Sequence, residues 1–380
     1  MMLPSATATS SRSPVLRVLE VQGTSGYGGS EIHTAQIAAA LQTDPRFAVH
    51  VVISPGGPIS AEMRALGIAV TELPLRSKFS LATQQQLFGI ARDFRPDLIH
   101  THIRNADWHG GIVARRLGCR WVSTIHDRVN MDCLSRRHHG PAAFVYRHLL
   151  MHADALLATA HNLAADTAVQ LGCAPERIHV VFNGSAAIPK HPDQRAQFGI
   201  AAGIPIIGMI ARLSPEKGHA WLLRALTQLP RELPWRLLLA GDGSLRQALQ
   251  QQAHDAGLGE RILWLGYRRD IPELLHCLDM LVAPSYREGF GRSVTEALAA
   301  GVPVIASQAG GLPEIIEHNR SGLLVPVGDD AALAAALHRL LADPALRARL
   351  AAAGHARWRE QFTVERFQRE TLAALARAVA

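Results

Sequence analysis

The 380-residue chain is poor in cysteine and has no long apolar run, and each absence restricts what the protein can be. Its four cysteines, Cys119, Cys133, Cys173 and Cys277, stand far apart with no Cys-x-x-Cys pair, which fits neither a disulfide framework nor a zinc site. The most apolar long segment, residues 142–160, is interrupted by charged and histidine residues. No stretch therefore supplies the roughly 20 uncharged residues of a membrane-spanning helix. We expect a cytoplasmic protein that does not cross a membrane.

Aromatic residues are also scarce, at 5% of the chain, and no stacking platform for nucleic acid is evident, so we predict no nucleic-acid partner. The 19 histidines are scattered along the sequence, and we predict no metal site. The net charge of +7 favours an anionic partner, either a phosphorylated small molecule or an anionic membrane surface. Residues 128–152 concentrate basic side chains around Phe144, Val145 and Tyr146. This segment is either a peripheral contact with the anionic inner membrane or a solvated surface.

Hydrophobic residues make up 48% of the chain, enough for two packed cores at this length. We predict a flexible N-terminal tail at 1–14 without the apolar run of a signal peptide, an N-terminal domain at 15–186 and a linker at 187–203. A C-terminal domain follows at 204–360, and a C-terminal helix within 361–380 is expected to pack back toward the N-terminal domain.

Short apolar runs alternate with helix-patterned segments throughout, which predicts two doubly wound α/β domains with parallel sheets facing across a cleft. Helices are expected at 31–41, 331–341 and 364–379. The predicted strands are Val15–Val21, His50–Ser54, Asp97–Thr101, Trp121–His126, Ala155–Thr159, Ile178–Phe182, Ile206–Ile210, Arg236–Ala240, Ile262–Leu265, Met280–Ala283, Val302–Ala306 and Gly322–Pro326.

The most informative segment is 284–306, which is typical of a strand, a glycine-rich loop, a helix and a second strand. Glu288 follows the first strand, Gly289 and Gly291 allow close approach of the backbone to a ligand, and Glu296 falls early in the helix. A helix N-terminus binds phosphate through its free N–H groups and its partial positive charge. Two carboxylates beside such a site can accept hydrogen bonds from sugar hydroxyls.

Two cations precede this segment, in the sequence Gly208-Met-Ile-Ala-Arg-Leu-Ser-Pro-Glu-Lys-Gly-His219. Arg212 and Lys217 follow a predicted strand end, and they are the residue types that grip a diphosphate, one as a bidentate fork and one as a point charge. Both would stabilise negative charge that grows on a departing diphosphate.

These residues resemble the retaining glycosyltransferases of family 4, whose C-terminal domain carries an Arg, a Lys and a Glu-x7-Glu pair. The resemblance implies the GT-B fold, with two Rossmann-like domains, and a nucleotide-diphospho-sugar donor. It implies that Arg212 and Lys217 bind the diphosphate, that Glu288 holds hydroxyls of the donor sugar and that Glu296 holds the ribose. His126 is expected to face the sugar, so His126, Arg212, Lys217 and Glu288 form the expected catalytic set.

Further matches run from Gly28-Gly-Ser-Glu31 to Gly310-Gly-Leu-Pro-Glu314. The chain departs from the family pattern at Ala211, where the family often has Gly, and at Phe182, where it often has Pro. The remaining donor-binding residues that the resemblance implies are Gly28, Gly29, Asn183, Gly241, Asp242, Phe290, Gly291, Arg292 and Ser293, and the acceptor-side residues are Glu31, Arg104 and Asp127.

The expected activity is therefore retaining transfer of a hexose to a glycan or lipid-linked acceptor, in bacterial cell-surface polysaccharide or lipopolysaccharide synthesis. The family's front-face mechanism needs no protein nucleophile, although the sequence leaves open that Glu288 attacks the sugar. The Asp-x-Asp metal motif of the other large glycosyltransferase fold is absent, so we predict metal-independent activity and no cofactor. Two alternatives stay open: a nucleotide-sugar epimerase or hydrolase of the same fold, and a non-catalytic basic adaptor.

Overall fold

The computed structural model describes residues 15–380 apart from 27, 76, 78–79, 127–140 and 193. The chain divides into two compact units. One is built from the residues up to Ser123 together with 152–155 and 372–380, and the other from 124–151 and 156–371.

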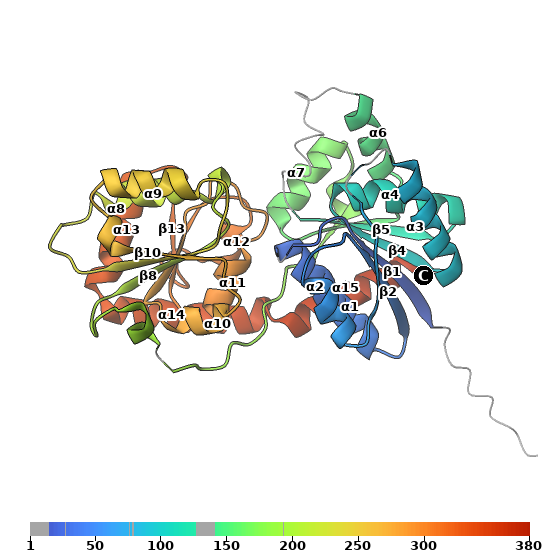
Figure 1. Cartoon of the computed structure of the whole chain (residues 1–380). Coiled ribbons are helices and arrows are strands. Elements are labelled where there is room, and N and C mark those ends of the chain that lie inside the picture. Colours follow the sequence, from blue (N-terminus) through green and yellow to red (C-terminus); the bar gives the residue numbers. More distant parts are fainter. Residues whose placement is uncertain (1–14, 27, 76, 78–79, 127–140, 193) are drawn as a thin grey trace, which may run out of the picture. The chain divides into compact units, whose positions relative to one another are not determined.

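The first sheet has seven strands in the order β3-β2-β1-β4-β5-β6-β7 (Figure 1). Helices α1 and α2 pack together on one face, and α3 and α4 pack together on the other. The strands are β1 (Leu16–Gln22), β2 (Phe47–Ile53), β3 (Ala69–Glu72), β4 (Leu98–His102), β5 (Arg120–Ile125), β6 (Ala155–Ala158) and β7 (Ile178–Val180), and the helices are α1 (Gly29–Thr43), α2 (Ile59–Ala65), α3 (Leu81–Phe94), α4 (Arg104–Leu117), α6 (Pro141–Leu150) and α7 (His161–Leu171).

The second sheet has six strands in the order β10-β9-β8-β11-β12-β13. Its strands are β8 (Ile206–Ile210), β9 (Arg236–Ala240), β10 (Ile262–Gly266), β11 (Met280–Ala283), β12 (Val304–Ser307) and β13 (Leu323–Val325). The helices that follow in the chain are α8 (His219–Leu226), α9 (Arg246–Asp255), α10 (Ile271–His276), α11 (Arg292–Ala299), α12 (Leu312–Ile315), α13 (Asp330–Ala342), α14 (Pro344–Gln361) and α15 (Val364–Val379).

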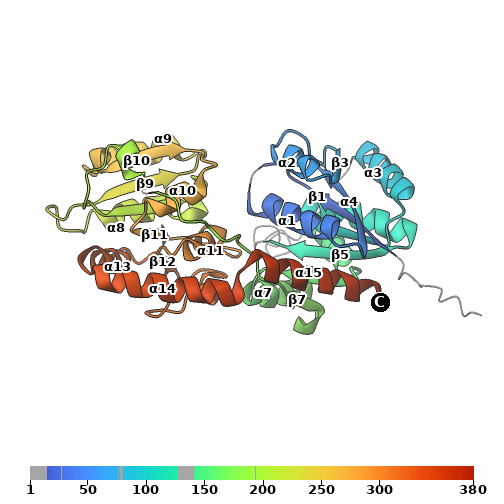
Figure 2. The same ribbon diagram turned by 90° about the horizontal axis from the view of Figure 1, so that it is seen from below.

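Helices cover both faces of the second sheet, which is why its strands are almost continuously apolar. One core joins the sheet to α8, α9 and α13 and contains the fully buried rings of Trp221 and Trp235. The opposite core joins it to α10 and α11. Helix α14 packs along α11 (Figure 2), where a side chain at Gly354 would collide with Leu298. The two cores pack the sheet on both faces and so position the strand ends from which the loops start.

In both sheets successive strands are added first on one side of the initial strand and then on the other. The order therefore switches between β1 and β4 in the first sheet, and between β8 and β11 in the second. Ligands of open α/β sheets bind outside the carboxyl ends of the strands at such a switch point. The loops that follow β1, β4, β8 and β11 are therefore the places where the fold favours a binding site.

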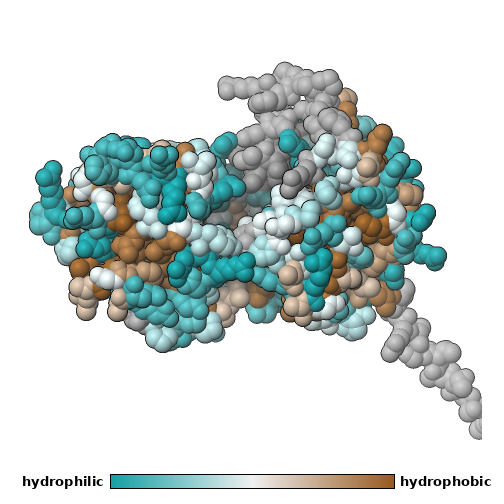
Figure 3. Space-filling view, in the orientation of Figure 1, coloured by the Kyte–Doolittle hydropathy of each residue, from teal (hydrophilic) through white to brown (hydrophobic). Residues whose placement is uncertain are grey.

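The structure confirms the two doubly wound parallel sheets, and it adds one strand that the sequence analysis missed. The missed strand, β3, lies at the edge of the first sheet, and none of its four side chains is buried. Such a strand lacks the apolar run by which the buried strands were recognised. Within the described residues, no helix is both long and apolar enough to span a membrane. The face shown in Figure 3 intermixes hydrophilic and hydrophobic areas.

Candidate functional site

Three of the four predicted catalytic residues, Arg212, Lys217 and Glu288, lie in the loops at the switch point of the second sheet. Lys217 lies in the turn after β8, and Glu288 lies in the loop between β11 and α11. The Lys217 ammonium contacts both carboxylate oxygens of Glu288, at 3.0 Å and 2.8 Å, and both side chains are mostly buried. The Ser285 hydroxyl donates to Glu288 at 3.1 Å. The carboxylate is thus held in one orientation beside a cation.

Arg212 has a different setting, because its side chain is 71% exposed. Its guanidinium donates to Glu216 at 3.0 Å, and the Ser214 hydroxyl donates to the same oxygen at 2.6 Å. Burial acts to raise the pKa of Glu216, but hydrogen bonds from Ser214, a backbone N–H and Arg212 outweigh it, so the pKa lies below its ordinary value. Glu216 is therefore ionised near neutral pH and steadies an arginine that remains accessible to an anion.

Glu296 lies on α11, one turn from the start of the helix. It accepts a hydrogen bond from the Arg292 guanidinium at 2.7 Å, an i,i+4 pair in which both side chains are about four-fifths buried. Gly291 precedes the helix with φ of +114°, where a side chain would meet Leu312. Phe290 is buried in the core below the loop, and Ser293 belongs to the first turn of the helix. The predicted helix start and its two acidic neighbours are thus all present.

Close backbone contacts hold these loops together. Gly310 has φ of +51°, and a Cβ there would lie 1.7 Å from the carbonyl oxygen of Glu288. Gly241 has φ of +138°, and a Cβ would lie 1.9 Å from the oxygen of Ala211. Asp242 accepts from the backbone N–H of Gly243 at 2.8 Å. Only glycine fits where one loop backbone lies directly on another. The two glycines therefore set the backbone positions of the loops that carry Arg212 and Glu288.

The residues predicted in the first half lie at helix starts and in loops around the first sheet. Gly28 and Gly29 form the start of α1, and Glu31 in its first turn accepts from the Ser30 hydroxyl at 3.0 Å. Arg104 begins α4 directly after β4, and His126 directly follows β5. Asn183 comes after β7, beside Gly184, which packs closely on residues 363–364. Asp127 lies outside the described residues, as do the basic residues at 128–140.

Two family models match consecutive parts of the chain. The model described as Glycosyltransferase Family 4 matches residues 27–185, and the model described as Glycosyl transferases group 1 matches residues 190–357. The chain belongs to glycosyltransferase family 4. It is accordingly a glycosyltransferase with the GT-B fold, as the motif resemblance implied.

Individual relatives agree with the family assignment. The D-inositol 3-phosphate glycosyltransferase of Xylanimonas cellulosilytica is 32% identical over 68% of this chain and 67% of the relative. LpsD of Rhizobium meliloti, a lipopolysaccharide core biosynthesis glycosyltransferase, is 36% identical over 49% of this chain and 53% of its own length. The crystal structure of Anabaena HepE in complex with UDP-glucose superposes with a TM-score of 0.84 at 27% identity and covers 95% of this chain and all (100%) of HepE.

Two further residues belong to this candidate site but were not predicted from the sequence. Glu216 orients Arg212, and Ser285 orients Glu288. Glu216 stands next to Lys217 in the sequence, and an acidic residue four positions after an arginine is a recognisable pairing signal. No comparable signal marks Ser285, because its role arises only from the fold of the loop.

Replacement of Gly310 by alanine is expected to displace the Glu288 loop, because the new methyl group would overlap the Glu288 carbonyl oxygen. A misplacement of about 1 Å in a catalytic group costs on the order of 100-fold in rate, so we expect kcat/KM to fall by about that factor. Gly301→Ala is the matched control: its φ is also positive, at +71°, but nothing lies within 4 Å of the added Cβ. Equal loss of activity in both variants would show that backbone strain alone is responsible.

His219 begins α8 beside Lys217 and is only 3% exposed, and within the described part of the chain neither ring nitrogen has a hydrogen-bond partner. Burial, with the Lys217 charge adding to it, lowers the pKa of His219 to about 4. In the unfolded chain His219 has a pKa near 6.5, so as the pH falls the unfolded state takes up a proton before the folded state does. The contribution of His219 to the free energy of unfolding is therefore complete above about pH 6.5 and is lost as the pH falls toward 4.

The size of this effect is about 3 kcal/mol, from roughly 1.4 kcal/mol per pKa unit. We expect His219→Phe to flatten the loss of unfolding free energy between pH 7 and pH 4, measured by urea denaturation at a series of pH values. His254→Phe, at an exposed helix position, should leave the slope unchanged. A slope in His219→Phe equal to that of the wild type would contradict the assignment.

Proposed function

We propose that this chain transfers a hexose, with retention of configuration and without a metal, from a nucleoside diphosphate sugar to a glycan or lipid-linked acceptor. The observation that carries the proposal is the Lys217–Glu288 contact at the switch point, together with the accessible Arg212 and the start of α11 in the same two loops. Cations and a helix N-terminus suit a diphosphate, and the two carboxylates suit sugar hydroxyls. HepE, crystallised with UDP-glucose, supports a uridine nucleotide as donor.

In the proposed reaction, the bond between the anomeric carbon and the diphosphate oxygen breaks while an acceptor hydroxyl oxygen attacks from the same face of the sugar. The acceptor proton passes to the departing phosphate oxygen, so the products are the glycoside and the nucleoside diphosphate. Arg212 and Lys217 stabilise the charge that grows on the diphosphate, and this differential stabilisation lowers the barrier. Glu288 orients the sugar through its hydroxyls, and His126 also contacts the sugar.

The pathway proposal is synthesis of a cell-surface polysaccharide or lipopolysaccharide. Its support is the relative LpsD, which is named for lipopolysaccharide core biosynthesis. An acceptor in such a pathway is a glycan, carried on a lipid in many cases, which is consistent with the net positive charge of +7. Incubation with a labelled UDP-hexose and deacylated core oligosaccharides would test it, and transfer to none of them would remove this acceptor class.

The donor proposal predicts selective stabilisation by one nucleotide class. UDP at about 100 times its Kd should stabilise the protein by about 2.7 kcal/mol, a rise of several degrees in melting temperature. Arg212→Ala should abolish most of this rise, and the exposed Arg231→Ala should preserve it. Thermal shift with UDP, GDP, ADP and their sugars is the measurement. No rise with any nucleotide would contradict the proposal, and release of free sugar without acceptor would favour the hydrolase alternative.

The proposed peripheral contact with an anionic inner-membrane surface rests on α6. Phe144 is 74% exposed and Val145 is 46% exposed on this helix. Arg147 serves another purpose, since its guanidinium donates to the carbonyl of Leu171 at 3.0 Å and 2.7 Å and so caps α7. Apolar insertion is therefore the expected contribution of α6. Flotation with anionic vesicles should fall for Phe144→Ser but not for Val169→Ser on the neighbouring helix, and equal flotation of both would contradict the contact.

A further inference from the structure

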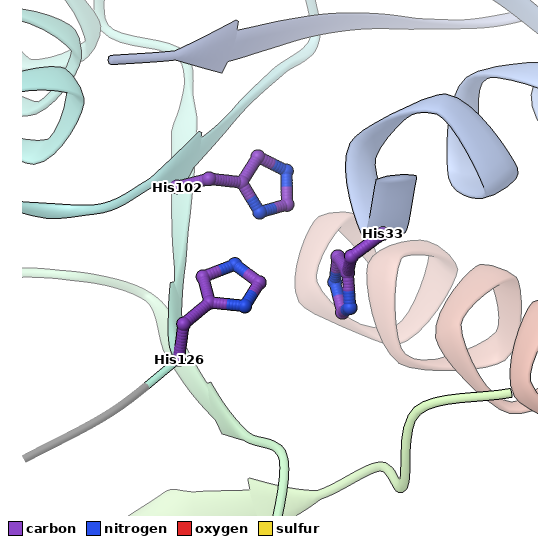
Figure 4. Close-up of side chains that lie close together, drawn as sticks. All are labelled: His33, His102 and His126. Carbon is purple, nitrogen blue, oxygen red and sulfur yellow. The ribbon is translucent and has the colours of Figure 1, made fainter. Parts of the chain in front are cut away.

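Three histidines that are far apart in the sequence meet beside the carboxyl ends of the strands of the first sheet. His33 comes from the first turns of α1, His102 is the last residue of β4, and His126 directly follows β5. Figure 4 shows the three imidazoles pointing toward one another, and one ring nitrogen from each lies within 4.8 Å of the others. The rings of His33 and His102 meet edge to face, with centroids 5.3 Å apart.

A buried carboxylate stands behind His102. Glu20 on β1 contacts His102 Nε2 at 2.7 Å and His100 Nδ1 at 3.0 Å, and all three side chains are 0% exposed. The register of β1 and β4 explains this arrangement, because Glu20 is aligned with His100 and residues two apart on a strand share a face. An ionised carboxylate only accepts hydrogen bonds, so His102 donates through Nε2.

This hydrogen bond determines which nitrogen of His102 can bind a ligand. With the proton on Nε2, the lone pair is on Nδ1, the other ring nitrogen. A carboxylate that orients an imidazole in this way is the usual outer partner of a metal-binding histidine.

The backbone next to His102 is also tightly constrained. Ile103 has φ of +66° and ψ of 156°, a conformation that a β-branched residue rarely adopts. It is the single residue that joins β4 to α4. Such strained positions concentrate at functional sites, where the surrounding structure holds them. His102 is therefore fixed by its carboxylate on one side and by its backbone on the other.

We propose that His33, His102 and His126 form a binding site for one divalent transition-metal ion of the Zn²⁺, Co²⁺ or Ni²⁺ type. Three neutral imidazoles with a fourth position open are a common zinc arrangement, whereas Mg²⁺ and Ca²⁺ require oxygen ligands that this triad does not offer. Ligand atoms about 2.0–2.1 Å from a tetrahedral zinc stand about 3.4 Å apart, so the rings close inward by about 1 Å on binding.

The consequence for activity rests on the proposed function. His126 is the residue expected to face the donor sugar, and a metal on its ring nitrogen would remove it from that position. The metal is therefore an inhibitor of glycosyl transfer, not its cofactor, and the predicted metal-independence of the reaction is compatible with the site. The triad was not predicted from the sequence because its members are 24 to 93 residues apart. The pair His100 and His102, two residues apart on one strand, was the only part of the arrangement that the sequence could indicate.

The test uses the full chain, freed of metal with a chelator and titrated with Co²⁺ and Zn²⁺. Co²⁺ should give the visible absorption of a low-coordinate nitrogen site at one equivalent, and Zn²⁺ should displace it. His33→Gln should weaken Zn²⁺ affinity by at least 100-fold, and Glu20→Gln by about 10–100-fold, the range for loss of an outer-shell partner. The control is His254→Gln at an exposed helix position, which should bind as the wild type does.

Circular dichroism melting of each variant separates loss of a ligand from loss of the fold. Zn²⁺ affinity unchanged in both His33→Gln and His126→Gln would overturn the site. A second assay follows donor turnover: one equivalent of Zn²⁺ should inhibit, and chelation should restore activity. If Zn²⁺ binds at the triad without inhibiting, the metal site stands and the placement of His126 at the donor sugar is wrong.

Discussion

Lys217→Met should weaken the affinity for UDP and Glu288→Gln should not, although both variants break the same ion pair. Lys217 contacts both oxygens of Glu288 before any ligand binds. A diphosphate must therefore compete with Glu288 for the ammonium. Methionine keeps the unbranched stem and removes the charge, so UDP should bind at least tenfold more weakly. Glutamine removes the competing negative charge, so UDP should bind as tightly as in the wild type or more tightly.

Turnover, in contrast, should fall in both variants. Loss of one group that stabilises transition-state charge typically costs about 100- to 1,000-fold in kcat, and we expect kcat/KM to fall by about 1,000-fold in Lys217→Met. Glu288→Gln should lower kcat by about 100-fold or more, because the amide holds the sugar hydroxyls less strongly. Titration calorimetry with UDP and steady-state kinetics give the two quantities separately.

The matched control breaks an ion pair of similar geometry elsewhere in the same domain. Arg320 contacts Glu317 at 2.9 Å in the segment between α12 and β13. Arg320→Met should leave Kd for UDP and kcat within about twofold of the wild type, since exposed pairs contribute at most about 1 kcal/mol. If Lys217→Met and Glu288→Gln weakened UDP binding equally, the pair would be a structural contact and not a site where donor and carboxylate compete.

The sequence predicted the second sheet almost completely, and the reason lies in its burial. Strands β8, β9 and β11 have the predicted limits, because each is a largely apolar run covered on both faces. The exposed edge strand β3 carries no such run and was missed. A strand buried on both faces requires a run of apolar residues, which can be recognised in the sequence. An edge strand depends mainly on backbone pairing with its neighbour, which requires no such run.

The candidate site was predictable to a different degree. The sequence predicted Arg212, Lys217 and Glu288 because their charges and their spacing along the chain already indicate a site for a sugar diphosphate. Glu216 and Ser285 support them through single hydrogen bonds whose existence depends on how the loops turn. The His33, His102 and His126 triad depends on three segments that only the folded sheet brings together. Sequence patterns identified the groups that would touch the ligand, and the fold was needed for the groups that hold them in place.

The second large effect is expected at Glu296, and it should appear in KM and not in kcat. If Glu296 holds the ribose, it binds a part of the donor that does not change during the reaction. Its contribution is then equal in the ground state and in the transition state. Hydrogen bonds to a charged group contribute about 1.5–3 kcal/mol, so Glu296→Ala should raise KM by about 10- to 150-fold with kcat changed less than about threefold.

The ribose hydroxyls themselves supply the control for this prediction. UDP should bind Glu296→Ala more weakly than the wild type by the same factor as KM, whereas 2′,3′-dideoxy-UDP should bind both proteins equally. Arg292→Ala should give a smaller change in the same direction, because Arg292 donates to Glu296 at 2.7 Å and orients the carboxylate without touching the ribose in the proposed arrangement. Equal weakening of UDP and of the dideoxy analogue by Glu296→Ala would place Glu296 away from the ribose. A fall in kcat would then assign this carboxylate to the sugar or to the diphosphate, where its contribution changes as the glycosidic bond breaks.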